Sequence, residues 1–299
     1  MSQIDEKPEL KKRAGKCHSL LNILRLTVFA NLFITICSLI MSLYTSMIFS
    51  LAINIPLLLF TAFGTLSSYS FHWLLPSTHN VLSPREEWSR AHKTLLFIFF
   101  LIGAAGSFYS ILSLTDHFTA IVPLIVLTFL YSSGKLPRGP FVLFRRYFIG
   151  KTIYLALMWT LITAYLPLAI SNTLWSNAGT LFLINRFFFL FAICILFDLR
   201  DKELDTLEGI KSFITLLSRK NIKYLFYSSL IVSIITGLAL NNFGFPLTPV
   251  SILLFPAILT VFLYNYSAKT RSELWFYFIL DGLMMLSGCI SILYSYFLK

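Results

Sequence analysis

Long apolar runs separated by short polar connectors dominate this sequence of 299 residues. A helix needs about 20 apolar residues to cross the hydrocarbon core of a bilayer. Because the chain is 57% hydrophobic and only 12% charged, it has too little charge to cover the surface of a soluble domain. The runs lie near residues 20–45, 50–75, 94–114, 118–132, 150–170, 178–198, 223–241, 247–266 and 275–297. We therefore expect an all-α, polytopic membrane protein with about nine transmembrane helices in a single domain over residues 1–299.

Lysine and arginine are concentrated in alternate connectors of this pattern. The basic segments are the polar N-terminal segment 1–19 and the connectors 76–93, 133–149 and 199–222. The connectors without either residue are 46–49, 115–117, 171–177 and 242–246. The positive-inside rule then predicts a multi-pass protein of the bacterial inner (cytoplasmic) membrane, with 1–19 as a cytoplasmic tail. The net charge of +11 is explained by orientation and by contact with anionic membrane lipids, so we expect no nucleic-acid partner.

Three aspartates follow the sixth apolar run directly. Asp198, Asp201 and Asp205 are spaced i, i+3 and i+7, so on a helix they share one face, within about 60° of each other. Like charges so placed repel unless a cation lies among them. Mg²⁺ suits this pattern, because it binds few carboxylates and keeps positions open for substrate phosphates. The basic residues interleaved with the aspartates leave a second interpretation open, a solvated helix end with surface ion pairs.

The same stretch resembles the second aspartate-rich motif of the UbiA superfamily of membrane prenyltransferases. The matching string is D-x-x-x-D at Asp201 and Asp205, followed after three residues by Gly-Ile-Lys-Ser at 209–212. The layout is also similar, with about nine helices and motif connectors after the second and sixth. The connector after the fourth helix, Tyr131-Ser-Ser-Gly-Lys135 with Lys151 downstream, is similar to the family's tyrosine-plus-basic segment.

The resemblance implies a UbiA-like helical bundle and a Mg²⁺-dependent transferase reaction within the membrane. Family members bind an isoprenyl diphosphate through two Mg²⁺ ions held by two aspartate-rich motifs, and pass the prenyl group to a lipophilic acceptor. In this chain Asp201 and Asp205 would be the catalytic metal ligands and Asp198 an additional ligand. The implied substrate-binding residues are Tyr131, Lys135, Lys151, Lys211 and His72.

The first aspartate-rich motif is missing from this chain. Residues 67–75 at the end of the second run read SSYSFHWLL, without a carboxylate, and the nearest acids are Glu86 and Glu87. His72 in this segment can donate to a diphosphate or bind a metal as neutral imidazole; the alternative is a hydrogen-bonded interfacial histidine. Two alternatives to a transferase therefore stay open within the same fold, a non-catalytic lipid-binding scaffold and an intramolecular terpene cyclase.

Arg186 lies inside the sixth run, 12 residues before Asp198. An intramembrane arginine is costly and should face a partner, a carbonyl or a water-filled cavity. The alternative is snorkelling of the side chain to the outer interface. This residue alone favours a further rival class, a transporter with ionisable groups at the membrane midplane.

Overall fold

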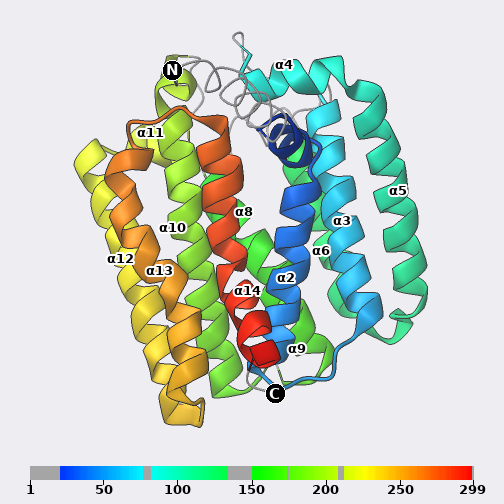
Figure 1. Ribbon diagram of the computed structural model, residues 1–299, viewed down its shortest axis with the longest axis vertical. Helices are drawn as coiled ribbons and strands as arrows, with labels where there is room; N and C mark the ends of the chain where they lie inside the picture. The colour runs from blue at the N-terminus through cyan, green and yellow to red at the C-terminus, as the bar shows by residue number, and fades with distance from the viewer. Residues whose placement is uncertain (1–20, 77–81, 134–149, 174, 208–211, 298–299) are drawn as a thin grey trace, which may run out of the picture.

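The computed structural model describes residues 21–76, 82–133, 150–173, 175–207 and 212–297. Within these ranges every regular element is a helix, as Figure 1 shows. The longer helices follow the apolar runs: α2 (Leu32–Ile48), α3 (Ile55–Leu74), α5 (Lys93–Leu112), α6 (Phe118–Ser133), α8 (Lys151–Thr160), α10 (Asn177–Leu207), α12 (Arg219–Ala239), α13 (Leu247–Ser267) and α14 (Asp281–Phe297). The all-α class is therefore confirmed.

Shorter elements connect and extend these helices. The π-helical turn η2 (Leu161–Tyr165) joins α8 to α9 (Leu166–Ile170), and a second π-helical segment, η4 (Trp275–Leu280), leads into α14. The remaining elements are α4 (Pro84–Ala91), α11 (Phe213–Leu216), η1 (Thr115–His117) and η3 (Leu240–Phe243). A helix over Leu21–Phe29 precedes α2.

Seven helices in the described part are long and apolar enough to cross a membrane. An eighth candidate is the helix Leu21–Phe29 together with α2, which are bent by 68° to each other. The helix α3 has 20 residues but is not among these spans, since its second half is rich in serine. These helices are compatible with a multi-pass membrane protein of seven or eight spans, and a ninth span through α3 stays a prediction.

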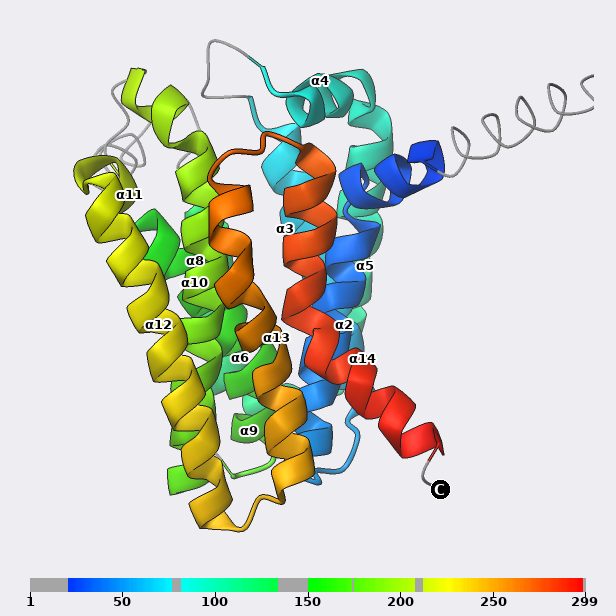
Figure 2. The ribbon, with the colours of Figure 1, turned by 60° about the vertical axis from the view of Figure 1, so that its left-hand side comes forward.

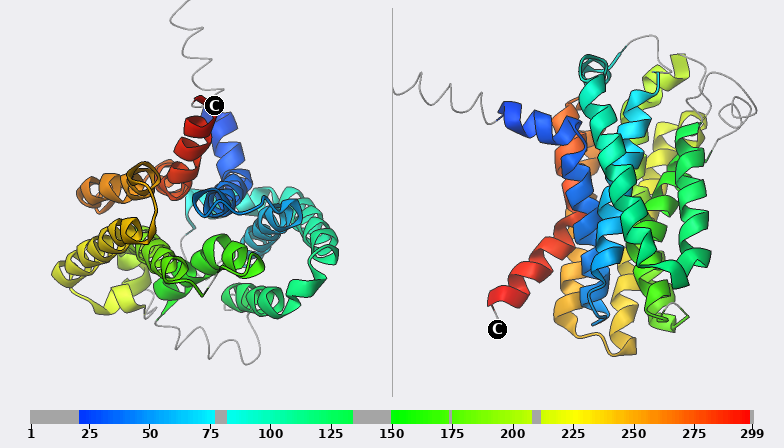
Figure 3. Two further views of the ribbon diagram at one scale, coloured as in Figure 1. Left: turned by 90° about the horizontal axis from the view of Figure 1, so that it is seen from below. Right: turned by 90° about the vertical axis from the view of Figure 1, so that its right-hand side faces the viewer.

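The helices pack in a closed ring. In sequence order α2, α3, α6, α8, α10, α12, α13 and α14 each pack against the next, and α14 returns to α2. The view along the bundle in Figure 3 shows this arrangement, with α5 packed against α3. The ring brings the C-terminal half of the chain back to its beginning, so η4 and α14 lie beside α2.

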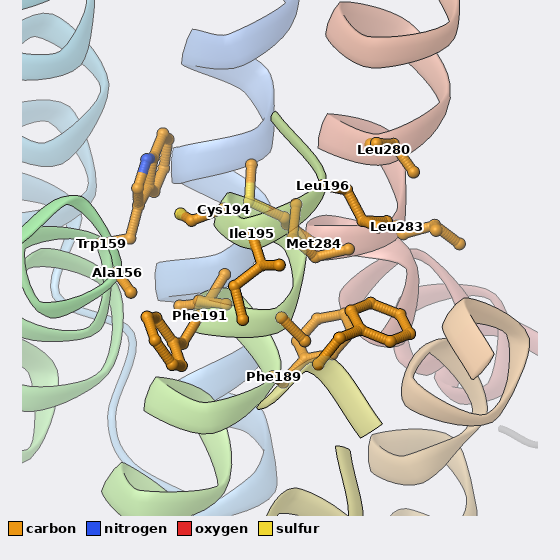
Figure 4. Packing of buried hydrophobic residues seen from close by; sticks show 14 of the residues in the cluster. Ala156, Trp159, Phe189, Phe191, Cys194, Ile195, Leu196, Leu280, Leu283 and Met284 are labelled. Carbon is orange, nitrogen blue, oxygen red and sulfur yellow. The ribbon is translucent and has the colours of Figure 1, made fainter. Parts of the chain in front are cut away.

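The most enclosed element of the ring is α10, whose membrane-length window is 61% buried. Figure 4 shows side chains of α10, among them Ile195 and Leu196, between Trp159 of α8 and Leu283 of α14. Ile195 and Leu196 are completely buried. A helix that is apolar around its whole circumference is buried on all sides. The helix that carries Asp198, Asp201 and Asp205 is therefore held in place by neighbours on several sides.

The described parts of the basic connectors lie at one end of the bundle. The helices α4 and α11, the first turn of α8 and the last turns of α10 lie at this end, which we call the basic end (Figure 1). The connectors 49–54, 113–117 and 240–246, with residues 171–173 and 175–176, lie at the opposite end and contain no lysine or arginine. The separation of charge predicted from the sequence is thus also a separation in space among the described residues; a cytoplasmic location of the basic end stays a prediction of the positive-inside rule.

Candidate functional site

Lys151 is the residue around which the predicted site comes together. It begins α8, half-buried at the basic end. Its ammonium group interacts electrostatically with Asp198 most strongly, and also with Tyr131, Asp205 and Asp201. These partners come from α6 and α10. The structure therefore brings together five of the residues that the sequence analysis assigned to the site.

Asp198 is the most firmly held of the three aspartates. Its side chain is buried, and the hydroxyl of Thr152 donates a hydrogen bond to its Oδ2. Thr152 directly follows Lys151, so the first turn of α8 supplies Asp198 with both a hydrogen bond and a positive charge. A buried carboxylate needs this kind of compensation. The role of Asp198 in the structure is thus to fix α8 against α10.

Asp201 is paired with its own neighbour in the chain. Arg200 donates from Nε to Oδ1 at 2.6 Å and from Nη2 to Oδ2 at 3.0 Å, a bidentate contact with both carboxylate oxygens. The Arg200 guanidinium also contacts the hydroxyl of Tyr277 at 3.3 Å and Glu273 Oε2 at 3.6 Å. Asp201 therefore faces η4, and its charge is already compensated.

The described side chains form no cluster of metal ligands around these aspartates. Within the described part of the chain, no three His, Cys, Asp or Glu side chains gather closely enough to hold one metal ion. Asp205, one turn beyond Asp201, is buried. Mg²⁺ is usually bound by only one or two carboxylates together with substrate phosphates. Asp201 and Asp205 are one helical turn apart, and Mg²⁺ binding by this pair stays a prediction.

Aromatic rings flank the lysine. The ring of His72 on α3 stacks on Tyr131 of α6 at 5.6 Å between centroids, and Tyr131 stacks on Tyr154 of α8 at 6.0 Å. Tyr131 also interacts electrostatically with Lys151 and Asp198. The stack connects three helices beside the charged residues. His72 and Tyr131 therefore lie beside the charged residues, and their role in substrate binding stays a prediction.

The sequence analysis missed Arg85, which was assigned to a polar loop. The structure forms α4 there: Ser83 caps the helix, its hydroxyl accepting from the Glu86 N–H, while Glu86 accepts from the Ser83 N–H. The guanidinium of Arg85 is only 2% exposed and lies between the rings of Trp73, at 4.3 Å, and Tyr277, at 4.0 Å. The capping box Ser-Pro-Arg-Glu was the signal that could have predicted this helix.

Two further acids face the arginines of this region. Asp281, buried at the start of α14, interacts electrostatically with Arg85 and Arg200. Burial raises the pKa of Glu273 above its usual range, and Arg200 and Arg85 partly offset this effect. Glu86 is used in the cap of α4, and Glu87 is exposed. The acids that interact with Arg85 and Arg200 are thus Glu273 and Asp281. Glu86 and Glu87, the acids nearest in sequence to the missing first motif, do not take this place.

The other residues singled out in the sequence are Lys135, Lys211 and Arg186. Lys135 and Lys211 lie outside the described residues. Arg186 is buried inside the bundle, where its Nη2 donates to the backbone carbonyl of Met284 at 3.0 Å and its guanidinium lies 5.3 Å from the Phe189 ring centroid. Of the two alternatives for Arg186, the structure therefore supports the carbonyl partner and not snorkelling.

A scan against protein-family models, a search of curated proteins and a search of solved structures each return no match. A functional assignment therefore depends on the residues of the chain itself.

Proposed function

We propose that this protein is a UbiA-like, Mg²⁺-dependent prenyltransferase that binds an isoprenyl diphosphate at the basic end of the bundle. The observation that carries the proposal is the position of Lys151 among Asp198, Asp201 and Asp205, with Tyr131 beside it. A cation next to several carboxylates is what a site for a metal-bound phosphate requires. The apolar helices that pack against α10 supply the surroundings that a prenyl chain needs.

The residues divide into three roles. Asp201 and Asp205 are the proposed ligands of Mg²⁺, which would take up negative charge on the diphosphate leaving group. Lys151 donates to the diphosphate oxygens, and Asp198 positions Lys151 through the first turn of α8. Since Arg200 donates to both oxygens of Asp201, a Mg²⁺ ion held by Asp201 and Asp205 would compete with this guanidinium for the carboxylate. If displaced, Arg200 adds a second cation beside the phosphates.

The aromatic stack has a part in the proposed reaction. Breaking the C–O bond to the diphosphate leaves an allylic cation on the prenyl chain, and the acceptor forms a bond to this carbon and loses a proton. Faces of aromatic rings attract cations by about 0.5–2 kcal/mol. The stacked rings of His72, Tyr131 and Tyr154 lie beside Lys151 and can serve this purpose. They also keep water away from a reactive cation.

One observation favours a second candidate function, the non-catalytic lipid-binding scaffold. Both oxygens of Asp201 accept from Arg200, and Thr152 donates to Asp198. If these contacts are permanent, the aspartates are structural ion-pair partners and no Mg²⁺ binds. The two candidates differ in whether the contact between Arg200 and Asp201 gives way to a metal ion.

Turnover distinguishes the two functions. Membranes containing the protein are incubated with radiolabelled geranyl, farnesyl or geranylgeranyl diphosphate and Mg²⁺, and the release of diphosphate is measured with and without chelator. The transferase predicts Mg²⁺-dependent release with at least one donor once a lipid extract supplies an acceptor, and loss of release in Asp205→Asn. Release no higher than in membranes without the protein, with every donor, supports the scaffold; equal release above that level in parent and variant contradicts the role of Asp205.

A further inference from the structure

A second candidate site lies at the basic end and does not include Asp205 among its lining residues. It is a cleft of about 680 Å³ between the helix Leu21–Phe29, α4 and the segment before η4. Its lining residues are Asn22, Arg25, Leu26, Phe29, Pro84, Trp88, Arg271, Ser272, Glu273 and Leu274. The proposed transferase mechanism does not use this cleft.

The cleft combines an apolar wall with two arginines. Phe29 and Trp88 meet edge to face at 5.8 Å and close one side. Arg25 and Arg271 supply positive charge from separate elements, and Arg25 forms no salt bridge with any residue in the described part of the chain. An apolar wall with nearby cations is complementary to an anionic amphiphile.

The side chains that already contact the charged residues of the cleft do not prevent an anion from binding there. Arg271 contacts Glu203 at 3.1 Å, but the two side chains are 49% and 61% exposed. Such exposed ion pairs contribute only about 0–1 kcal/mol, so Arg271 can exchange Glu203 for a ligand. Glu273 also lines the cleft, but it faces Arg200 at 3.6 Å. The two arginines therefore make the electrostatic potential of the cleft positive.

The cleft lies where lipid headgroups are expected. The helix Leu21–Phe29 leaves the bundle sideways at the basic end, as Figures 2 and 3 show, and exposes Leu21, Ile23 and Leu26. Its bend to α2 is held at Asn31, which has a φ of 65°, accepts from Arg85 at 2.7 Å and donates to Ser70 at 3.4 Å. A short helix with exposed apolar residues, set across the bundle, is typical of the membrane interface.

We propose that this cleft binds the headgroup of an anionic phospholipid. The phosphodiester lies between Arg25 and Arg271, with Asn22 and Ser272 as further donors, and the acyl chains follow Leu26 along the outside of the bundle. The phosphate accepts from both guanidinium groups, which recognise phosphate well because of their planar set of donors. A zwitterionic lipid binds less tightly, because its own cation is repelled by the same arginines.

Lipid retention measured by native mass spectrometry tests the site without any prenyl diphosphate. The protein is reconstituted in nanodiscs with equal amounts of phosphatidylglycerol and phosphatidylcholine, released, and the retained lipids are counted. We expect at least fivefold preference for phosphatidylglycerol in the parent, loss of the preference in Arg25→Ala/Arg271→Ala, and its partial return in Arg25→Lys/Arg271→Lys. The lysine pair keeps the charge and so separates a binding defect from misfolding.

Arg219→Ala is the matched control. Arg219 pairs with the same Glu203, at 2.7 Å, and is exposed at the basic end, but it does not line the cleft. Its removal should leave the preference unchanged. An equal loss in Arg219→Ala, no preference in the parent, or displacement of the lipid by millimolar glycerophosphoglycerol would each overturn the proposal, the last because it indicates a site for soluble phosphates.

Discussion

Arg200 holds both carboxylate oxygens of Asp201, the residue that follows it in the chain, at 2.6 and 3.0 Å. Arg200 links Asp201 to Glu273 and Tyr277 of the last helical segment, while Lys151 of α8 interacts electrostatically with all three aspartates and most strongly with Asp198. The aspartates of the motif thus serve two sets of partners. Under the proposed function, a Mg²⁺ ion would compete with this bidentate contact for Asp201.

Weakening this contact should strengthen metal binding. In Arg200→Lys the charge is kept, but an ammonium group cannot bind both carboxylate oxygens in the planar geometry of a guanidinium. We expect the affinity for Mg²⁺ to rise about three- to tenfold, which corresponds to about 0.7–1.4 kcal/mol. Calorimetry in the presence of a non-hydrolysable prenyl diphosphate measures it. An unchanged affinity in a variant with the parent's melting temperature means that Asp201 is not a ligand.

Two variants should separate the contribution of Lys151 to diphosphate binding from its contribution to stability. Lys151→Met leaves Asp198 without its main cation, so the melting temperature should fall. In Lys151→Met/Asp198→Asn no uncompensated charge is left, and the melting temperature should recover. The binding of prenyl diphosphate should stay weaker by about 1.5–3 kcal/mol in both variants, as for a lost charge-assisted hydrogen bond. Recovery of binding in the double variant would contradict the assignment of Lys151 to the diphosphate.

Arg85 should contribute to stability in a pH-dependent way. Arg85→Gln removes a buried charge that faces Glu273 and Asp281, and should destabilise the protein by about 3–5 kcal/mol at neutral pH. The pKa of Glu273 is raised by burial, so a proton binds more tightly in the folded than in the unfolded state. The stabilisation from this proton is present at low pH and is lost as the pH rises through the folded pKa.

The defect of Arg85→Gln should therefore shrink as the pH falls from neutral into the acidic range, because protonation of Glu273 removes the charge that the arginine compensates. Melting temperatures of parent and variant across this range measure the difference. A defect that is constant with pH would show that Arg85 acts through its packing between Trp73 and Tyr277 alone. Arg219→Gln, at an exposed ion pair, is the control and should change stability little.

The topology and the ninth span can be tested together. Single cysteines are placed at Ile53, Trp175, Glu87 and Leu216 in a cysteine-free background; all four positions are exposed. If α3 crosses the membrane and the basic end is cytoplasmic, an impermeant thiol reagent added to intact cells labels the cysteines at 53 and 175, but not those at 87 and 216. Labelling at 175 without labelling at 53 would mean that α3 does not span.

The sequence was sufficient for the helices but only partly for the site. Apolar runs of membrane length predict helices because nothing else satisfies the backbone in a bilayer. The proximity of Lys151 to the aspartates came only from a resemblance, because spacing within one helix does not show what the neighbouring helix contributes. Arg85 and Tyr277 were missed for the same reason: their contact joins elements that are far apart in the chain and meet only when the ring closes.

The central claim is that Asp201 and Asp205 bind Mg²⁺ together with a prenyl diphosphate. Calorimetry with a non-hydrolysable farnesyl diphosphate analogue, with and without Mg²⁺, tests it most directly on the parent, on Asp205→Asn and on Glu203→Gln, an exposed acid on the same helix. The account predicts Mg²⁺-dependent binding with one ion per diphosphate, a loss of at least tenfold in Asp205→Asn, and parent-like binding in Glu203→Gln. Binding that is independent of Mg²⁺, or equal in the parent and Asp205→Asn, would contradict it.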